Sequence, residues 1–268
     1  MRDKTKIIGI LNLTEDSFSD GGKYLDKKNA IIYVKKLLNQ GCSIIDIGAE
    51  STRLGFHDIS ADSQLEKILP ILSEIKKINQ DIKISIDTRA SQVAEEALKE
   101  GASIINDVSS GTYDQYMFEV ASKYNAEIIL THMPKEHLEK KNIKSNNIVK
   151  DIYDYFDKAI KDAAAKGIKQ ENIIIDPGIS FGKSGSDNIE ILKNIEYFVK
   201  KFERVCLGVS NKRFSSKLFK DIKDDDLKII SLTISAYATF KNVEFLRVHD
   251  VDVNQDAIDV AWKTINSL

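Results

Sequence analysis

Cysteine is scarce in this sequence, and the two residues present, Cys42 and Cys206, lie far apart and form no Cys-x-x-Cys pair. We therefore expect buried free thiols in a reducing compartment rather than a disulfide framework. Histidine is scarce as well, and none of the four histidines has the HExxH spacing of a zinc enzyme. These shortages argue against a disulfide-rich scaffold and against zinc catalysis.

The chain also lacks a long apolar run and a strong charge of either sign. No stretch approaches the length of a membrane span, and the apolar run after the basic start MRDKTK is too short for a signal peptide. A net charge of −2 gives no electrostatic footprint for nucleic acid or for an anionic membrane. We therefore expect a cytoplasmic protein that binds neither.

The chain has eight short β-branched runs that alternate with segments of helical periodicity, without a linker or a break in composition. The β-branched runs predict strands at 6–11, 43–47, 82–86, 103–105, 127–131, 172–175, 204–209 and 244–248. The segments between them predict helices at 27–40, 61–79, 90–100, 114–124, 148–167, 187–201, 225–241 and 255–267.

Eight βα units in 268 residues predict an α/β fold, a single (β/α)₈ TIM barrel that spans residues 1–268. The alternative is an open, doubly wound parallel sheet. No GxGxxG segment follows the first predicted strand, which argues against a dinucleotide-binding fold of that kind. In a (β/α)₈ barrel the active site lies at the C-terminal ends of the strands.

Polar residues stand at or just after the ends of the predicted strands. They are Asn12, Asp46, Asp87, Asn106, Asp107, Thr131, His132, Asp176, Ser210, Lys212, Arg247 and His249. For Asp46 and Asp107 we favour the simpler interpretation that they cap the following helix. The convergence of the others on one end of the barrel indicates a binding site.

Arg247 and His249 are two positions apart, so their side chains share one face of the last predicted strand. Barrels of this type often hold phosphate near that strand, and a guanidinium beside a titratable imidazole predicts an anion site. The alternative is a surface ion pair of Arg247 with Glu244 or Asp250.

The segment IIIDPGISFGKSG, residues 173–185, resembles a phosphate-binding loop but is one residue too short for one. We therefore treat the similarity as accidental, which leaves Asp176 in need of another role. Together with Asp87 and Asn106 it offers carboxylates and an amide to a flat heterocycle that carries adjacent N–H donors. The predicted site is thus divided into a heterocycle-binding part deep in the barrel and an anion-binding part at its rim.

Seven segments that occur in order along the chain resemble those of the dihydropteroate synthases. They are GILNLTEDSFSDGG, DIGAESTR, ISIDT, IINDVSSG, DPGISFGK, GVSNK and LRVHDV. This family of folate-pathway enzymes joins a pterin pyrophosphate to p-aminobenzoate. The resemblance covers nearly the whole chain and implies a (β/α)₈ barrel that forms a homodimer through its C-terminal helices.

The resemblance also implies roles for individual residues. Asp87, Asn106 and Asp176 would bind the pterin, Lys212 would contact its ring, and Phe181 would line the pocket. The implied reaction is a substitution at the exocyclic CH₂ of the pterin, in which pyrophosphate leaves before p-aminobenzoate attacks. The aniline nitrogen is neutral at pH 7 and needs no strong general base.

For the remaining parts of the substrates, the resemblance implies a second group of residues. Asn12 would hold the Mg²⁺ that bridges the pyrophosphate, while Arg247 and His249 would hold the pyrophosphate itself. From the loop after the second strand, Thr52 and Arg53 would reach the pyrophosphate or p-aminobenzoate.

Two further assignments concern the p-aminobenzoate end of the site. Ser210 would lie near the carboxylate of p-aminobenzoate, and Asp20, with Phe18 beside it, would belong to the first loop. The chain departs from the family pattern at four positions, namely Glu15, Leu54, Ser180 and Asn211. For the order of the loops and the structure of the p-aminobenzoate pocket, the resemblance therefore gives no firm expectation.

Two other functions fit a pterin-binding barrel. One is a methyltetrahydrofolate:corrinoid methyltransferase, which has no need of a pyrophosphate site, so that Arg247 and His249 count against it. The other is a catalytically silent pterin-binding paralogue that acts as a regulator or scaffold. The complete set of polar residues at the strand ends favours the synthase over both.

Overall fold

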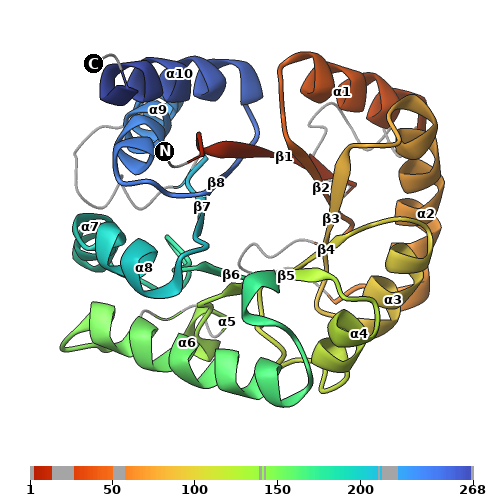
Figure 1. The fold of residues 1–268 in the computed structure, drawn as a ribbon, viewed down its shortest axis with the longest axis horizontal. Helices are drawn as coiled ribbons and strands as arrows, with labels where there is room; N and C mark the ends of the chain where they lie inside the picture. Colours follow the sequence, from red (N-terminus) through yellow and green to blue (C-terminus); the bar gives the residue numbers. More distant parts are fainter. Residues whose placement is uncertain are drawn as a thin grey trace.

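Eight parallel strands form a ring, and the helices surround it (Figure 1). The structure is a computed structural model that describes residues 3–13, 27–50, 58–138, 141, 143–210, 212 and 223–266. The strands are β1 (Lys6–Asn12), β2 (Ile44–Gly48), β3 (Lys83–Asp87), β4 (Ile104–Asp107), β5 (Glu127–Thr131), β6 (Ile173–Asp176), β7 (Cys206–Gly208) and β8 (Phe245–Val248).

Helices follow the strands along the chain and cover the outside of the ring. They are α1 (Lys27–Asn39), α2 (Ala61–Ile78), α3 (Ser91–Lys99), α4 (Met117–Lys123), α5 (Lys135–Leu138), α6 (Ile148–Ala165), α7 (Gly185–Lys193), α8 (Ile195–Phe202), α9 (Asp224–Phe240) and α10 (Val251–Asn266), with a 3₁₀ turn η1 (Gln170–Asn172). In the described part of the chain, no helix combines the length and apolar character needed to cross a membrane.

The order of hydrogen-bonded strands is β6-β5-β4-β3-β2-β1-β8-β7, with every pair parallel. A single parallel bridge between Ile175 and Val205 joins β6 to β7 and nearly closes the ring. The predicted (β/α)₈ barrel is therefore confirmed, and the open doubly wound sheet is wrong. We call the junction between β6 and β7 the seam.

The predicted helix at 187–201 is wrong as one element, because the structure divides it into α7 and α8. Asn194 ends the first and begins the second. Its side-chain amide donates to the Glu190 carbonyl at 2.8 Å. Asparagine competes with the helical backbone for hydrogen bonds in this way, which makes it a common point of interruption.

The core has two parts, one inside the ring and one between the ring and the helices. Inside, one layer of side chains fills the barrel: Ile8, Ile44, Ile104, Ile129, Ile174, Cys206 and Phe245. We call this layer the floor. The larger part lies outside, where apolar strand residues meet buried helix residues such as Leu37, Leu72 and Phe156. Because both faces of the strands are buried, they read as nearly continuous apolar runs.

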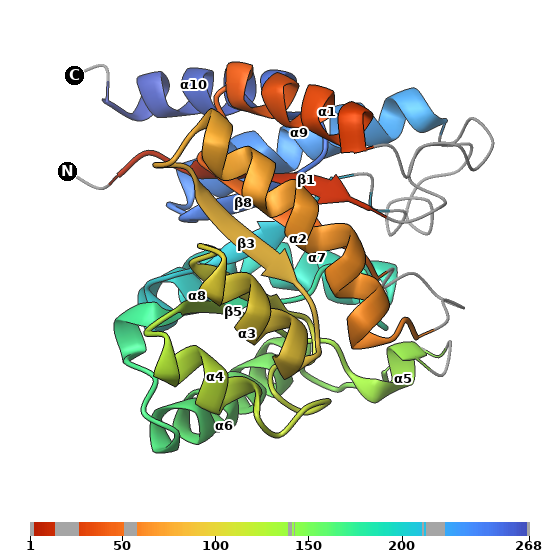
Figure 2. The same ribbon diagram turned by 90° about the vertical axis from the view of Figure 1, so that its right-hand side faces the viewer.

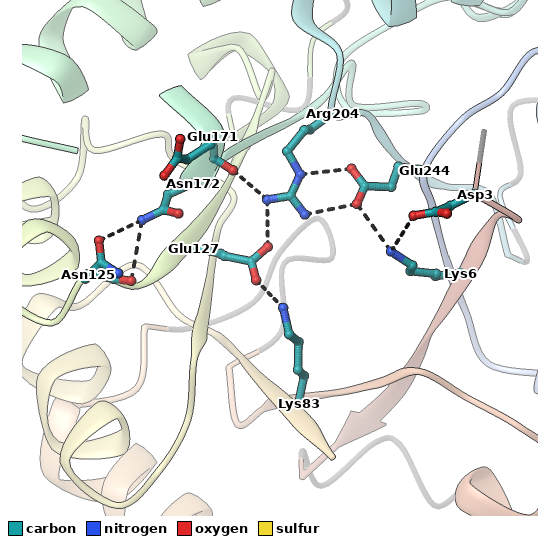
Figure 3. A network of polar contacts seen from close by, with 9 residues as sticks. All are labelled: Asp3, Lys6, Lys83, Asn125, Glu127, Glu171, Asn172, Arg204 and Glu244. Atoms are coloured by element: carbon teal, nitrogen blue, oxygen red, sulfur yellow. Dashed lines mark hydrogen bonds and ion pairs between the residues drawn. The ribbon is translucent and has the colours of Figure 1, made fainter. Parts of the chain in front are cut away.

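Charged residues cross the N-terminal end of the barrel beneath the floor (Figure 3). The fork of Arg204 binds both oxygens of Glu244 at 2.9 and 3.0 Å, and its Nη1 lies 2.7 Å from Glu127. Lys83 pairs with the same Glu127. Since Arg204 lies two residues before β7, these pairs tie the seam to β5 and to the start of β8. This end of such barrels is associated with stability rather than with catalysis.

Candidate active site

The polar residues of the site form a layer directly above the floor. Side chains in a strand point to the same side at every second position. In β2, β4, β6 and β8, the residues two positions after the floor are Asp46, Asn106, Asp176 and Arg247. The change from apolar to polar side chains creates a site at the C-terminal end of the barrel, toward which the arrows of β1 and β3 point in Figure 2.

Arg247 lies at the centre of this layer and connects three strands. Its Nε donates to Asp46 Oδ2 and its Nη2 to Asp87 Oδ2, both at 2.6 Å. Asn106 Nδ2 donates to the same oxygen of Asp46 at 3.2 Å. Burial raises the pKa of Asp87 to about 7, and the nearby guanidinium of Arg247 opposes that rise. The cluster therefore combines buried carboxylates with one cation.

The simpler interpretations of Asp46 and Arg247 are wrong. Asp46 caps no helix, because it lies within β2, is fully buried and binds Arg247 inside the barrel. Arg247 forms no surface ion pair with Glu244 or Asp250, because its guanidinium lies within the polar layer and Glu244 binds Arg204 instead.

The predicted helix cap at Asp107 is also wrong, because its bonds are made within the turn that follows β4. Its carboxylate accepts hydrogen bonds from Ser109 N at 2.8 Å, Ser109 Oγ at 2.6 Å and Gly111 N at 2.6 Å. These bonds stabilise the turn after β4 rather than the start of α4, which begins at Met117.

A pocket of about 170 Å³ opens above the polar layer, and Asn106, Asp176, Phe181, Lys212 and Arg247 contribute to its wall. Asp176 accepts a hydrogen bond on each carboxylate oxygen, from Gly178 N at 2.8 Å and from Gly208 N at 3.2 Å. Of the five residues predicted to contact the heterocycle, Asn106, Asp176, Phe181 and Lys212 line this pocket. The fifth, Asp87, lies beneath it and binds Arg247.

Lys212 and Phe181 form the aromatic side of the pocket. Lys212 Nζ lies 4.6 Å from the centroid of the Phe181 ring, which is a cation–π distance. Burial lowers the pKa of Lys212 to about 8, and the charge of Asp176 opposes that change. A flat ring bound here would meet a cation, an aromatic face and a carboxylate.

The predicted rim residues lie one step further out. His249 Nδ1 and Ser210 Oγ are 3.1 Å apart, and the Tyr33 hydroxyl donates to the His249 carbonyl at 3.2 Å. Asn12 is half-buried at the end of β1.

The residues predicted from the two long loops lie outside the described residues. These are Asp20, Thr52 and Arg53, together with Phe18 and the departures Glu15 and Leu54. Asn211, after β7, lies outside the described residues as well. Their predicted roles stay predictions. Of the other strand-end residues, Thr131 contributes to the pocket wall, whereas His132 packs edge-on against Tyr155, with 4.8 Å between the ring centroids.

Two residues near the pocket were not predicted as functional. His137, in the short helix α5, lines the pocket, and its Nδ1 accepts a hydrogen bond from Gly182 N at 3.1 Å. Its ring meets Phe181 edge-on, with 5.0 Å between centroids. No periodicity or spacing marks a residue in so short a helix. The second is Lys183, which is fully buried behind the pocket. Its position in a Gly-Lys-Ser segment marks it only as part of an apparent phosphate-binding loop.

Ser180 has a left-handed backbone at the pocket wall, with φ of 74°. Within the described part of the chain its Oγ is buried without a hydrogen-bond partner. A residue with a Cβ is about 1–2 kcal/mol less stable in this conformation than glycine. Glycine offsets part of that advantage because it loses more conformational entropy on folding. We expect Ser180→Gly to raise the free energy of unfolding by about 1 kcal/mol, measured by urea denaturation.

Ser180→Ala is the matched control for this prediction, because it removes the hydroxyl but keeps the Cβ and hence the backbone strain. It should give less than half of the gain. An equal gain in both variants would assign the cost to the buried hydroxyl instead of the backbone.

Comparison with known proteins connects this site to one family. The sequence pattern described as "Pterin binding enzyme" matches residues 8–249. A dihydropteroate synthase from Streptococcus pyogenes is 39% identical over 255 residues, which cover 95% of this chain and 93% of that protein.

Two solved structures have the same fold over almost their whole length. A dihydropteroate synthase from Xanthomonas albilineans with 4-aminobenzoic acid has a TM-score of 0.91 at 28% identity, covering 99% of this chain and 94% of that one. The enzyme from Anaplasma phagocytophilum with bound 6-hydroxymethylpterin-monophosphate has a TM-score of 0.87 at 33% identity, covering 98% and 100%.

Proposed function

The chain belongs to the pterin binding enzyme family, and we infer that it is a dihydropteroate synthase, a transferase of folate biosynthesis. It condenses 6-hydroxymethyl-7,8-dihydropterin pyrophosphate with p-aminobenzoate and releases pyrophosphate. The observation that carries this inference is the polar layer around Arg247, which opens into a pocket with a carboxylate, an amide and a cation in its wall.

The pterin is held by its N–H groups and by its ring. Asp176 and Asn106 supply a carboxylate and an amide at the pocket wall, and these groups match adjacent N–H donors and a carbonyl. Lys212 and Phe181 lie against the ring. Asp87 completes the set from below, where its bond to Arg247 fixes its orientation.

The pyrophosphate lies toward the rim, near Arg247 and His249. An arginine has five N–H donors, and the two that bind Asp46 and Asp87 leave others to stabilise charge that develops on the leaving group. Ser210 holds His249 in place through its hydroxyl and lies near the carboxylate of p-aminobenzoate. Asp20, Thr52 and Arg53 complete this proposal from the loops.

Asn12 is the residue that would hold Mg²⁺, which would neutralise charge on the phosphates. Among the described residues, no three His, Cys, Asp or Glu side chains gather as a metal site. An amide oxygen fits a hard cation that takes most of its ligands from phosphates and water, as Mg²⁺ does. The half-buried position of Asn12 at the end of β1 suits that arrangement.

Bond breaking at the pterin CH₂ precedes attack in the proposed reaction. Arg247 and His249 stabilise the departing pyrophosphate, and the carboxylates Asp87 and Asp176 stabilise positive charge on the remaining pterin. The neutral amine of p-aminobenzoate then attacks the CH₂ carbon and afterwards loses a proton. The two buried thiols, Cys42 and Cys206, agree with a cytoplasmic enzyme.

The test is pyrophosphate release from the pterin pyrophosphate, with and without p-aminobenzoate and Mg²⁺. A synthase forms dihydropteroate, with one pyrophosphate released for each, only when both substrates and the metal are supplied. A methyltransferase would bind a methylated pterin and release no pyrophosphate. A silent paralogue would bind the pterin without turnover.

The proposed homodimer forms through α9 and α10, which lie side by side on one flank of the barrel (Figure 1). Ile229, Phe240 and Val260 expose 61%, 47% and 67% of their surface there, and an apolar groove between the helices includes the last two. Exposed apolar patches of this kind commonly mark protein interfaces.

We expect Val260→Asp to weaken the dimer at least tenfold, because a carboxylate would be buried without a partner. Sedimentation velocity over a range of concentrations measures the change. Ile189→Asp is the control, since Ile189 is an exposed isoleucine on α7, and that variant should dimerise like the wild type. A Val260→Asp protein that remains fully dimeric would place the interface elsewhere.

A further inference from the structure

Lys183 is buried deeply and lies outside the set of residues that the proposed reaction uses. Only 1% of its surface is exposed. Its Nζ donates to three backbone carbonyls, those of Gly178 at 2.8 Å, His132 at 2.9 Å and Phe181 at 3.2 Å. An ammonium has three N–H donors, so these carbonyls match its full capacity. The lysine of the Gly-Lys-Ser segment therefore points into the protein rather than toward a phosphate.

The three carbonyls belong to two separate segments, each of which also contributes a residue to the pocket wall, Thr131 in one and Phe181 in the other. His132 directly follows β5, whereas Gly178 and Phe181 belong to the loop between β6 and α7. Lys183 thus fastens this loop to the end of the neighbouring strand. Burial lowers the pKa of Lys183 to about 7, against the opposing pull of Asp176, so the burial of this amine carries a cost that the carbonyls offset.

The loop that Lys183 fastens carries pocket contacts on both of its sides. Gly178 N donates to Asp176 Oδ1 at 2.8 Å, and Phe181 presents its ring to Lys212. The approach of the loop to β5 is very close. A Cβ on Gly178, whose φ is 71°, would lie 2.2 Å from the His132 carbonyl oxygen. No side chain fits between Gly178 and the His132 carbonyl. Lys183 therefore bonds two segments whose backbones are already in close contact.

We propose that Lys183 is a positioning residue that holds the loop of residues 177–183 in its binding geometry before the pterin arrives. This inference rests on the proposed function, since it assigns to Lys183 the alignment of Asp176 and Phe181 against a pterin ring. Pre-organised contacts bind more tightly because little order remains to be imposed on binding.

Three variants test the proposal by calorimetric titration with 6-hydroxymethylpterin monophosphate. Lys183→Met keeps the length and removes the donors, and we expect its affinity for the probe to fall at least tenfold. Lys183→Gln keeps two N–H donors and should lose less. Lys193→Met is the control, because Lys193 is an exposed lysine on α7, and its affinity should equal that of the wild type.

A merely structural role for Lys183 would lower stability without changing the affinity of the folded molecules. An affinity of folded Lys183→Met within twofold of the wild type therefore overturns the proposal. In turnover assays, the KM for the pterin pyrophosphate should rise more than kcat falls. A wild-type protein that binds no probe contradicts the proposed function itself, which separates the two failures.

Hydrogen exchange on the free wild-type protein gives a result that requires neither a variant nor a ligand. The amides of residues 178–182 should exchange slowly without the probe, close to the rate found with it. Rapid exchange that slows only when the probe binds would show that the loop is ordered by the ligand, and it would overturn the proposal even if Lys183→Met fails to fold.

Discussion

Replacing Arg247 with alanine should lower turnover by about a hundredfold or more, because the guanidinium is proposed to stabilise charge on the leaving pyrophosphate. From the sequence alone, pterin affinity would remain nearly intact, since Arg247 is assigned only to the pyrophosphate. The structure changes this expectation. Arg247 also binds Asp46 and Asp87, so its loss leaves two buried carboxylates without that cation, and we expect pterin affinity to fall about tenfold as well.

Steady-state kinetics and calorimetry measure the two effects of Arg247→Ala separately. Arg204→Ala is the matched control, because Arg204 also lies between two carboxylates but at the opposite end of the barrel. It should lower stability and leave the kcat of the folded enzyme close to that of the wild type. Turnover of Arg247→Ala within a few-fold of the wild type would refute the assignment of Arg247 to the leaving group.

Replacing Asp176 with asparagine should weaken pterin binding about ten- to a hundredfold, which corresponds to roughly 1.5–3 kcal/mol for a charge-assisted hydrogen bond. The carboxylate already accepts from Gly178 N and Gly208 N, one on each oxygen. An amide has only one acceptor oxygen. One of these backbone N–H groups would therefore face an NH₂ group, and the orientation toward the pterin would change.

Asp107→Asn is the matched control for Asp176→Asn. Asp107 is also a buried carboxylate at the last position of a barrel strand, and it binds backbone N–H groups. Its bonds stabilise a turn, so that its replacement should lower stability and preserve pterin affinity. Calorimetry on the two folded variants decides the point, and equal losses of affinity would mean that Asp176 acts only through the structure of its loop.

Much of the fold follows from local sequence, because period-two and helical patterns are properties of neighbouring residues. The polar layer could be anticipated in the same way, since Asn106, Asp176 and Arg247 each interrupt or end an apolar run. Asp46 could not be assigned correctly. An aspartate near a strand end looks like a helix cap, and only the position of Ile44 in the floor shows that Asp46 points into the barrel.

Contacts between distant segments account for the other omissions. His137 reaches the pocket because α5 folds back toward the loop after β6, where Gly182 donates to it. The direction of the Lys183 side chain depends on carbonyls from two separate loops. Neither arrangement leaves a periodic trace in the sequence. The interruption at Asn194 could be predicted only in part, because asparagine permits a break in a helix but does not require one.

The seam links the proposed ligand site to the closure of the barrel. At its N-terminal end the seam is held by Arg204, and at its C-terminal end it is crossed by the bond from Gly208 N to Asp176. One carboxylate therefore contributes to the closure of the ring and, in the proposed function, to recognition of the pterin. A substitution at Asp176 should therefore change ligand affinity and barrel stability together, whereas pocket residues that do not span the seam can change affinity alone.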